Sequence, residues 1–205
     1  MPRSVEFFEH QFQRQVQMCE FELNPFERLA LDYLQGAVLD LGCGLGNLTL
    51  AAARRGCIVT AIDASPTAIA RIRDAAERER LPVSALQADL ADFQIQHDYD
   101  AVVAIGLLMF FPKPQALRML AEIKQHVRTG GYAIINVLIE GTTYMDMFTP
   151  GEYCLFRREE LAERFSDWTI EAARYDEFPA PGETLKVFAT VITRNPAVSS
   201  AHRPQ

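Results

Sequence analysis

The fold is decided by the stretch VLDLGCGLGN at residues 38–47, where an apolar run ends in three closely spaced glycines. The apolar run predicts a buried strand, and the glycines predict a loop that opens a helix. Glycine suits such a loop because it adopts positive φ and leaves the backbone N–H groups open to a ligand. Open α/β sheets bind ligands at the carboxyl ends of their strands, so we expect the binding site here.

The spacing of these glycines separates two classes of ligand. It is G-x-G-x-G with Asp40 two residues before the first glycine, whereas the dinucleotide fingerprint is G-x-G-x-x-G. A dinucleotide brings a pyrophosphate to the helix N-terminus, but S-adenosylmethionine brings a sulfonium and an ammonium, which a carboxylate attracts. The pattern favours S-adenosylmethionine; an NAD-dependent reductase and a tight turn without a ligand are the alternatives.

Two further acids follow predicted strands. Asp63 ends the second apolar run, where a carboxylate can accept hydrogen bonds from both ribose hydroxyls, or can cap the next helix. Asp89 follows the third run, where its carboxylate can accept from the adenine amino group while Leu90 offers a backbone N–H, or can serve a turn. The predicted cofactor-binding residues are Asp40, Gly42, Cys43, Gly44, Asn47, Asp63, Ala64, Asp89, Leu90 and Ile105.

Apolar runs alternate with helical patterns along residues 37–138, which is typical of a doubly wound α/β sheet. We expect strands at 37–41, 58–62, 83–87, 101–105 and 132–138, and helices at 48–54, 66–80 and 114–127, the second capped by Ser65. Beyond residue 141 we expect a helix at 157–165 and a closing hairpin formed by 169–175 and 185–193.

The N-terminal part predicts two helices outside this alternation. An amphipathic helix over 5–17 presents Phe7, Phe8 and Phe12 on one face, and a second helix covers about 25–34. We interpret 1–194 as a single domain whose residues 1–35 form a helical lid. Residues 195–205 have little apolar surface to bury and are expected to form a disordered tail.

Composition limits the partners of the chain. The formal net charge is −7, which disfavours binding to nucleic acid. No segment resembles a signal peptide or reaches the roughly twenty apolar residues that span a bilayer, so we expect a cytoplasmic protein with no membrane contact. The four cysteines are far apart and predict neither a metal site nor a disulfide framework. A small-molecule substrate is expected, and the oligomeric state stays open.

Residues 38–137, with these glycine and acid motifs, resemble the class I S-adenosylmethionine-dependent methyltransferases. The segments LLMFF at 107–111, GGY at 130–132, the helix start at 156–161 and FAT at 188–190 further resemble the bacterial tellurite-resistance methyltransferases. This resemblance implies a mostly parallel seven-stranded sheet, an N-terminal helical lid, S-adenosylhomocysteine as product, and methylation of tellurium or selenium species.

The chain departs from that second family near the final hairpin. The family carries a His-Arg pair and a further arginine, where this sequence has Phe178-Pro179-Ala180 and Val187. The roles of those family residues are therefore not assigned to residues of this chain, and no catalytic side chain is assigned. We expect an acceptor that is related to that of the family but different from it.

The segment after the fourth strand predicts an apolar acceptor pocket. It reads GLLMFF at 106–111 and lacks the Asn/Asp-Pro-Pro-aromatic motif of enzymes that methylate amines. An apolar pocket favours a small soft nucleophile such as a thiol or a selenide, because burying a compact charge without partners is costly. A catalytically silent S-adenosylmethionine-binding domain and a methyltransferase for another small molecule remain alternatives. The predicted wall residues are Met109, Phe110, Tyr144 and Phe148.

Overall fold

The protein is described by a computed structural model that covers residues 3–196. One sheet of seven strands forms its centre, in the order β3-β2-β1-β4-β5-β7-β6. The first five strands of this order are parallel, and β7 is antiparallel to both β5 and β6. The predicted doubly wound, mostly parallel sheet is therefore confirmed. The strands are β1 Ala37–Leu41, β2 Ile58–Asp63, β3 Val83–Gln87, β4 Tyr99–Ile105, β5 Val127–Leu138, β6 Thr169–Ala180 and β7 Thr184–Arg194.

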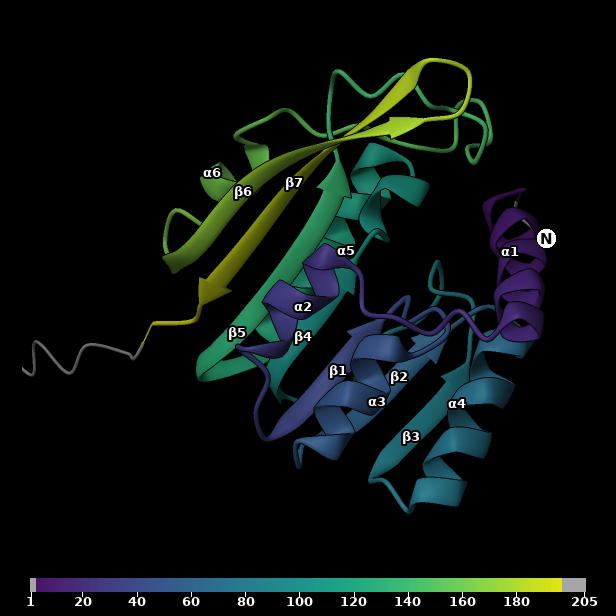
Figure 1. Cartoon of the computed structure of the whole chain (residues 1–205). Coiled ribbons are helices and arrows are strands. Elements are labelled where there is room, and N and C mark those ends of the chain that lie inside the picture. Colours follow the sequence, from purple (N-terminus) through teal and green to yellow (C-terminus); the bar gives the residue numbers. More distant parts are fainter. Residues whose placement is uncertain (1–2, 197–205) are drawn as a thin grey trace, which may run out of the picture.

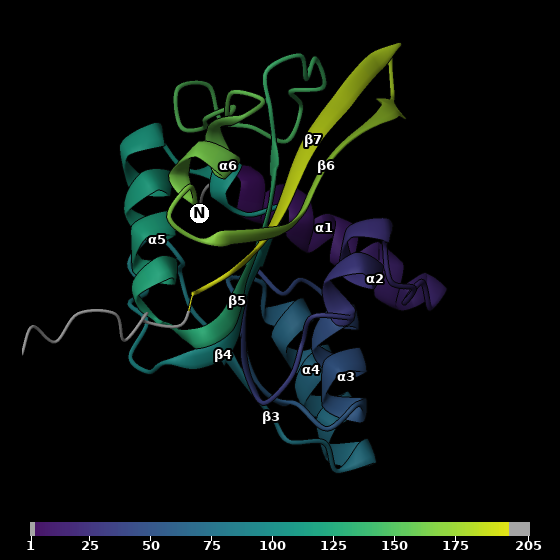
Figure 2. The same cartoon turned by 90° about the vertical axis from the view of Figure 1, so that its left-hand side faces the viewer.

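Helices cover both faces of the sheet (Figure 1). Figure 2 shows α2, α3 and α4 on one side and α5 and α6 on the other, while α1 lies across the end of the sheet. The apolar side chains form a separate cluster on each face, so each helical layer buries its own core. The helices are α1 Arg3–Met18, α2 Pro25–Leu31, α3 Asn47–Arg54, α4 Pro66–Glu79, α5 Lys113–Gln125 and α6 Glu160–Arg164, with a 3₁₀ turn, η1, at Leu108–Phe110.

Local sequence signals explain where α2 and α4, on one face of the sheet, begin. Asn24 and Glu27 form a capping box at α2, in which each side chain accepts from the other residue's backbone N–H. Ser65 caps α4 as predicted, since its hydroxyl accepts from the backbone N–H of Ala68 at 3.0 Å. The second helix ends at Leu31, three residues earlier than expected, because the backbone then forms a turn in which Tyr33 N–H donates to Ala30.

The boundary between α5 and β5 was predicted wrongly. The helix ends at Gln125, and β5 begins at Val127 and contains the pair Gly130-Gly131. Asn195 explains the longer strand: its backbone exchanges hydrogen bonds with both glycines, and its side-chain amide donates to Val127 O at 2.7 Å. Asn195 thus continues the pairing of β7 with β5, which corrects its assignment to a tail. Residues 197–205 lie outside the described residues.

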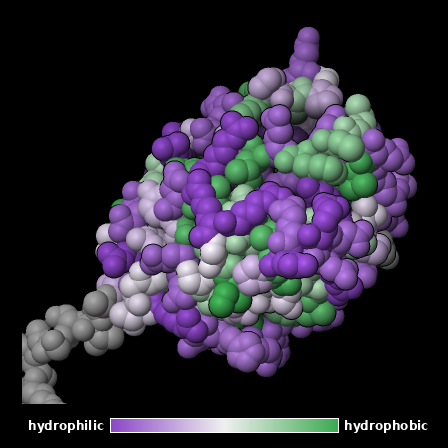
Figure 3. Space-filling view, turned by 60° about the horizontal axis from the view of Figure 1, so that its bottom comes forward, coloured by the Kyte–Doolittle hydropathy of each residue, from purple (hydrophilic) through white to green (hydrophobic). Residues whose placement is uncertain are grey.

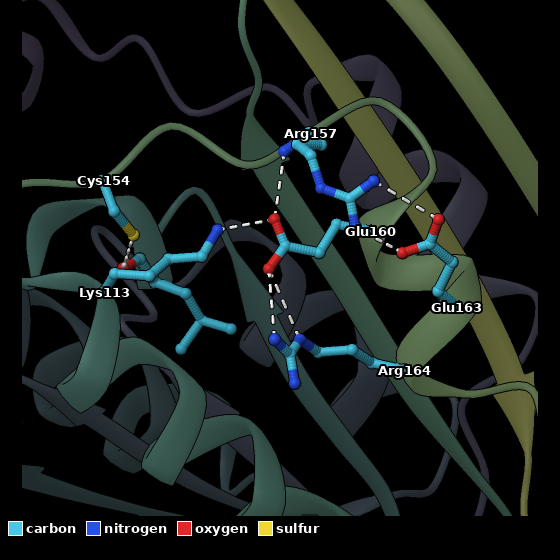
Figure 4. A network of polar contacts seen from close by, with 7 residues as sticks. Lys113, Cys154, Arg157, Glu160, Glu163 and Arg164 are labelled. Atoms are coloured by element: carbon cyan, nitrogen blue, oxygen red, sulfur yellow. Dashed lines mark hydrogen bonds and ion pairs between the residues drawn. The ribbon is translucent and has the colours of Figure 1, made fainter.

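A buried carboxylate joins α5 and α6, the two helices on the same face of the sheet (Figure 4). Glu160 is 4% exposed and accepts from Lys113 Nζ at 2.6 Å and from the backbone N–H of Arg157 at 3.1 Å, and Arg164 lies at 3.4 Å. Residues 157–160 form a backbone turn in which Glu160 N–H donates to Arg157 O at 3.1 Å, and α6 begins at Glu160 and not at 157 as predicted. This network attaches α6 to the start of α5.

The outer surface has the mixed character of an ordinary globular domain. Polar residues cover most of the face in Figure 3, with apolar residues in patches between them. Within residues 3–196, no helix is both long and apolar enough to cross a membrane.

Candidate functional site

The glycine loop between β1 and α3 forms the floor of the site. Gly42, Gly44 and Gly46 all have positive φ, at 68°, 51° and 73°. A Cβ on Gly46 would lie 2.4 Å from Ile72, so this glycine is required by packing against α4. At Gly44 the nearest atom to a Cβ is 3.2 Å away and belongs to Phe12 of α1. The ring of Phe12 thus approaches the loop closely at Gly44, and α1 lies beside a cavity that the loop also lines.

A cavity of about 730 Å³ occupies this space. Its volume lies within the usual range for small-molecule and cofactor sites. All ten residues predicted to bind the cofactor line this cavity. They come from the carboxyl ends of β1, β2 and β4, the segment after β3 and the start of α3, which is where the fold predicts a ligand.

Asp40 is a buried acid at the floor of the cavity. Its carboxylate is 5% exposed and accepts from Thr49 Oγ1 at 2.6 Å. Burial raises the pKa of Asp40 to about 7, against the opposing effect of the Thr49 hydrogen bond. A cation in the cavity would favour the ionised form, so this position is suited to a positively charged ligand group.

Asp63 and Asp89 differ in how firmly they are held. Asp63 accepts from the backbone N–H groups of Gly44 at 2.8 Å and Ser65 at 2.9 Å, and burial raises its pKa in spite of these bonds. Asp63 therefore supports the glycine loop as well as facing the cavity. Asp89 is exposed, and its Oδ1 accepts from Ala91 N–H at 2.9 Å, so it forms the turn that was its alternative role while also lining the cavity.

Asn47 supplies a buried acceptor with no partner. Its Nδ2 donates to the carbonyl of Glu22 at 3.1 Å, whereas its Oδ1 has no hydrogen-bond partner among the described residues. Asn47 and Asp40 both line the cavity, and their side-chain oxygens attract positive charge. A carboxylate and an unpartnered amide oxygen fit the ammonium and sulfonium of S-adenosylmethionine better than the pyrophosphate of a dinucleotide.

Cys43 lines the cavity through the loop, yet its side chain belongs to the core. It packs with residues of α3, β2 and α4, and burial raises the pKa of its thiol well above the usual value. A thiol that stays protonated is a poor nucleophile, so Cys43 is a packing residue here.

The acceptor wall was predicted only in part. Met109 and Phe110 of η1 line the cavity, but Tyr144 and Phe148 do not. Both are buried behind the wall, where the Phe148 ring lies 5.1 Å from that of Phe110 and 4.8 Å from that of Tyr153. They were wrong as wall residues because the loop after β5 folds its aromatic rings into a core cluster of its own.

The far end of the cavity contains residues that the sequence analysis did not single out. Asn136 and Leu138 of β5 line it together with Lys186 and Phe188 of β7. Asn136 is fully buried; its Nδ2 donates to Thr190 Oγ1 at 2.8 Å, and its Oδ1 has no partner among the described residues. A signal existed, because Asn136 is the polar residue in the otherwise apolar second half of β5, where a buried amide requires partners.

Helix α1 covers the cavity. Phe8, Gln11 and Phe12 line it, and the Phe8 ring packs edge-on against Phe110 at 5.3 Å. Glu9 attaches the helix to the start of α4, accepting from Ser65 Oγ and Thr67 Oγ1, each at 2.5 Å. Desolvation opposes these bonds, yet together they hold the pKa of Glu9 below its usual value.

Sequence comparisons show what the central part of the chain is similar to. A family described as a methyltransferase domain matches residues 38–131. Hemagglutinin 1 of Eikenella corrodens is 31% identical over 166 residues, which cover 77% of this chain and 54% of that protein. The probable S-adenosyl-L-methionine-dependent methyltransferase TehB of Haemophilus influenzae is also 31% identical over 166 residues, covering 77% of this chain and 56% of TehB. The chain spans about half the length of these curated relatives.

Solved structures share the fold. The crystal structure of Haemophilus influenzae TehB matches with a TM-score of 0.74 at 24% identity, covering 88% of this chain and 65% of that chain. A Burkholderia thailandensis 1,6-didemethyltoxoflavin-N1-methyltransferase, with bound 1,6-didemethyltoxoflavin and S-adenosylhomocysteine, matches with a TM-score of 0.69 at 22% identity, covering 95% and 87%. At these identities the likeness establishes the architecture that the sequence predicted.

Proposed function

Since the chain carries a class I S-adenosylmethionine-dependent methyltransferase domain that resembles TehB, we propose that it methylates a small molecule with a soft nucleophile, such as a thiol or a selenium or tellurium species. The observation that carries this proposal is a single cavity with two different ends. Acids and the unpartnered Asn47 Oδ1 are found at the end of the glycine loop, and the end at η1, β5 and β7 is lined mainly by apolar side chains, with Asn136 and Lys186 among them.

The proposed cofactor roles follow the chemistry of each side chain. Asp40 and Asn47 Oδ1 would hold the positively charged methionine part of the cofactor, and Asp63 would accept from the ribose hydroxyls. Asp89 and the backbone of Leu90 would contact the adenine. When bound, S-adenosylmethionine supplies a methyl group whose bond to sulfur breaks as the acceptor's lone pair forms the new bond, which leaves S-adenosylhomocysteine.

The protein contributes alignment and exclusion of water. Good alignment of two reacting groups can remove on the order of 7–11 kcal/mol of a barrier, so an acceptor that is already ionised needs no strong general base. α1 covers the cavity, and Met109, Phe110 and Phe188 give the acceptor end an apolar wall. Polarizable sulfur or selenium loses less on leaving water for such a wall than a compact oxyanion does. The resemblance of the sequence to the bacterial tellurite-resistance methyltransferases is consistent with this class of acceptor.

The proposal is tested by binding and by turnover. Calorimetry with S-adenosylmethionine, S-adenosylhomocysteine and NAD should give binding of the first two alone, and Asp63→Ala should weaken that binding by about 1–3 kcal/mol. Labelled methyl groups are then followed into equal concentrations of selenide, an alkyl thiol, a catechol, a primary amine and tRNA.

Selenide and the thiol should take up most of the label. Preferential labelling of the catechol, amine or tRNA would overturn the soft-acceptor assignment. Binding of the cofactor with no labelled acceptor in a wider panel would favour a catalytically silent binding domain.

A further inference from the structure

Lys186 is a cation at the acceptor end of the cavity. It is half-buried on β7, and its Nζ lies 4.6 Å above the centre of the Tyr144 ring. Among the described residues it is the one cationic side chain that lines the cavity, and no acid within this part of the chain forms an ion pair with it. Desolvation lowers the pKa of Lys186 with no neighbouring carboxylate to restore it. An ammonium in such a position lacks a counter-charge.

The alternation of β7 directs this side chain to the cavity. Val187 and Ala189 pack into the cluster on the α5 face, so Lys186, Phe188 and Thr190 lie on the opposite face. Lys186 and Phe188 line the cavity directly, and Thr190 reaches it by holding Asn136. The family's arginine position, Val187, points the other way, so Lys186 is not a substitute at that position.

Strand register separates Lys186 from the reacting end. Asn136 is paired with Thr190 across the β5–β7 ladder, and its carbonyl accepts from Gly106 N–H at the end of β4, next to the cofactor residue Ile105. Lys186 is four residues from Thr190 along β7, which corresponds to roughly 13 Å of strand. An extended lysine shortens this separation but does not remove it. The ammonium of Lys186 therefore lies apart from the point of methyl transfer, and an acceptor that reaches both must be several covalent bonds long.

The charged side chains that line the cavity are also distributed unevenly between its two ends. Asp40, Asp63 and Asp89 lie at the glycine-loop end, where Glu22 and Glu27 of the N-terminal segment also line the cavity. Lys186 stands beside the apolar side chains of the other end, where the exposed Glu152 of the loop after β5 is the acid that lines the cavity. A cation at the acceptor end disfavours a positively charged acceptor and favours a negative one.

From this arrangement we propose that the acceptor is a small organic anion, in which a carboxylate or similar group, separated from the nucleophile by several bonds, is bound by the Lys186 ammonium. This inference rests on the proposed methyl transfer to a soft nucleophile and specifies its substrate class. Asn136, whose buried Oδ1 has no partner among the described residues, lies on β5 between the two ends. The apolar side chain of Phe188 contacts the carbon chain that joins them.

A matched pair of thiols tests the assignment. 6-Mercaptohexanoate and 6-mercapto-1-hexanol share the nucleophile and the carbon chain and differ in the terminal charge. The unmodified protein should use the carboxylate with kcat/KM at least about ten-fold above that of the alcohol, because a charge-assisted bond to a desolvated ammonium is strong. Lys186→Met should abolish this preference by raising KM for the carboxylate, while Lys186→Arg should retain it.

Two controls isolate the charge. Lys124→Met removes a lysine on the far side of the sheet and should leave the preference intact. The affinity of Lys186→Met for S-adenosylmethionine should equal that of the unmodified protein, which also shows that the variant folds. Equal use of the two thiols by the unmodified protein, or a preference that survives in Lys186→Met, would overturn the inference.

A binding experiment separates this inference from the proposed function. Hexanoate and 1-hexanol are titrated into the protein loaded with S-adenosylhomocysteine, where no methyl transfer can occur. Binding of hexanoate that Lys186→Met loses supports the anion site even if neither thiol is methylated, in which case the soft-nucleophile assignment fails alone. Methylation of both thiols without selective binding of hexanoate would overturn the anion site at Lys186 and would leave the proposed methyl transfer to a soft nucleophile in place.

Discussion

At the scale of single residues, Asp40 couples the cavity to pH. Burial raises its pKa to about 7, so near neutral pH about half of the carboxyl groups carry a proton. A bound cation favours the ionised form and lowers that pKa. Affinity for a cationic ligand should therefore be reduced below pH 7, where binding must first remove the proton, and should level off above pH 8.

We predict that S-adenosylmethionine binds about ten-fold more tightly at pH 8 than at pH 6, from the fraction of ionised Asp40 in the free protein. Calorimetry at the two pH values measures this difference. Asp40→Asn provides the control, since an amide does not titrate: its affinity at pH 8 should be lower, and the part of the pH dependence due to Asp40 should vanish. The same pH dependence in both proteins would exclude Asp40 as the group responsible.

At the scale of elements, α1 is held over the cavity by few contacts. None of its residues is fully buried, and Glu9 supplies its hydrogen bonds to Ser65 and Thr67 at the start of α4. A carboxylate there also interacts favourably with the positive end of the α4 dipole.

Glu9→Gln should loosen α1 and increase the dissociation rate of S-adenosylmethionine by about ten-fold, because hydrogen bonds to a charged group contribute about 1.5–3 kcal/mol. Stopped-flow displacement by S-adenosylhomocysteine measures the rate. Glu6→Gln is the matched control, since Glu6 is an exposed acid on the same helix and should leave the rate unchanged. If both variants released the cofactor at the rate of the unmodified protein, α1 would have no role in retaining it.

The α6 network offers a second comparison at this scale. Glu160 and Glu163 are on the same helix and each pairs with basic groups, but the side chain of Glu160 is 6% exposed and that of Glu163 is 53% exposed. Glu160→Gln should lower the free energy of unfolding by about 3 kcal/mol, as expected for breaking a buried pair, and Glu163→Gln by at most about 1 kcal/mol. Urea unfolding measures both values, and equal effects would show that burial does not decide the strength of these pairs.

At the scale of the whole molecule, local signals predicted the cofactor half well. The order of elements along 37–138 followed from apolar periodicity and glycine spacing, and the ten residues predicted to bind the cofactor, chosen from glycine spacing and the position of acids after strands, all line one cavity. Each of these signals lies within a few residues of the group it positions. The acceptor half depends on pairing between β5 and β7, whose partners are about fifty residues apart in the sequence.

That distance explains the errors at the acceptor end. Asn136 and Lys186 line the same cavity only because the ladder joins their strands, and the sequence contains no local sign of this register. Tyr144 and Phe148 were predicted to form the wall from their type alone, but the loop after β5 turns them into a cluster behind it. Aromatic residues pack equally well in either place, so composition could not distinguish the two.

The position of β7 between β5 and β6 has a consequence for synthesis on the ribosome. β5 is almost entirely apolar in its second half, and one of its edges is covered by β7, whose residues are made last among the strands. Until Thr184–Arg194 have emerged, that edge presents unpaired backbone groups beside apolar side chains, which is the feature that makes a nascent chain prone to aggregate. The period between translation of β5 and of β7 is therefore when a chaperone would protect this protein most.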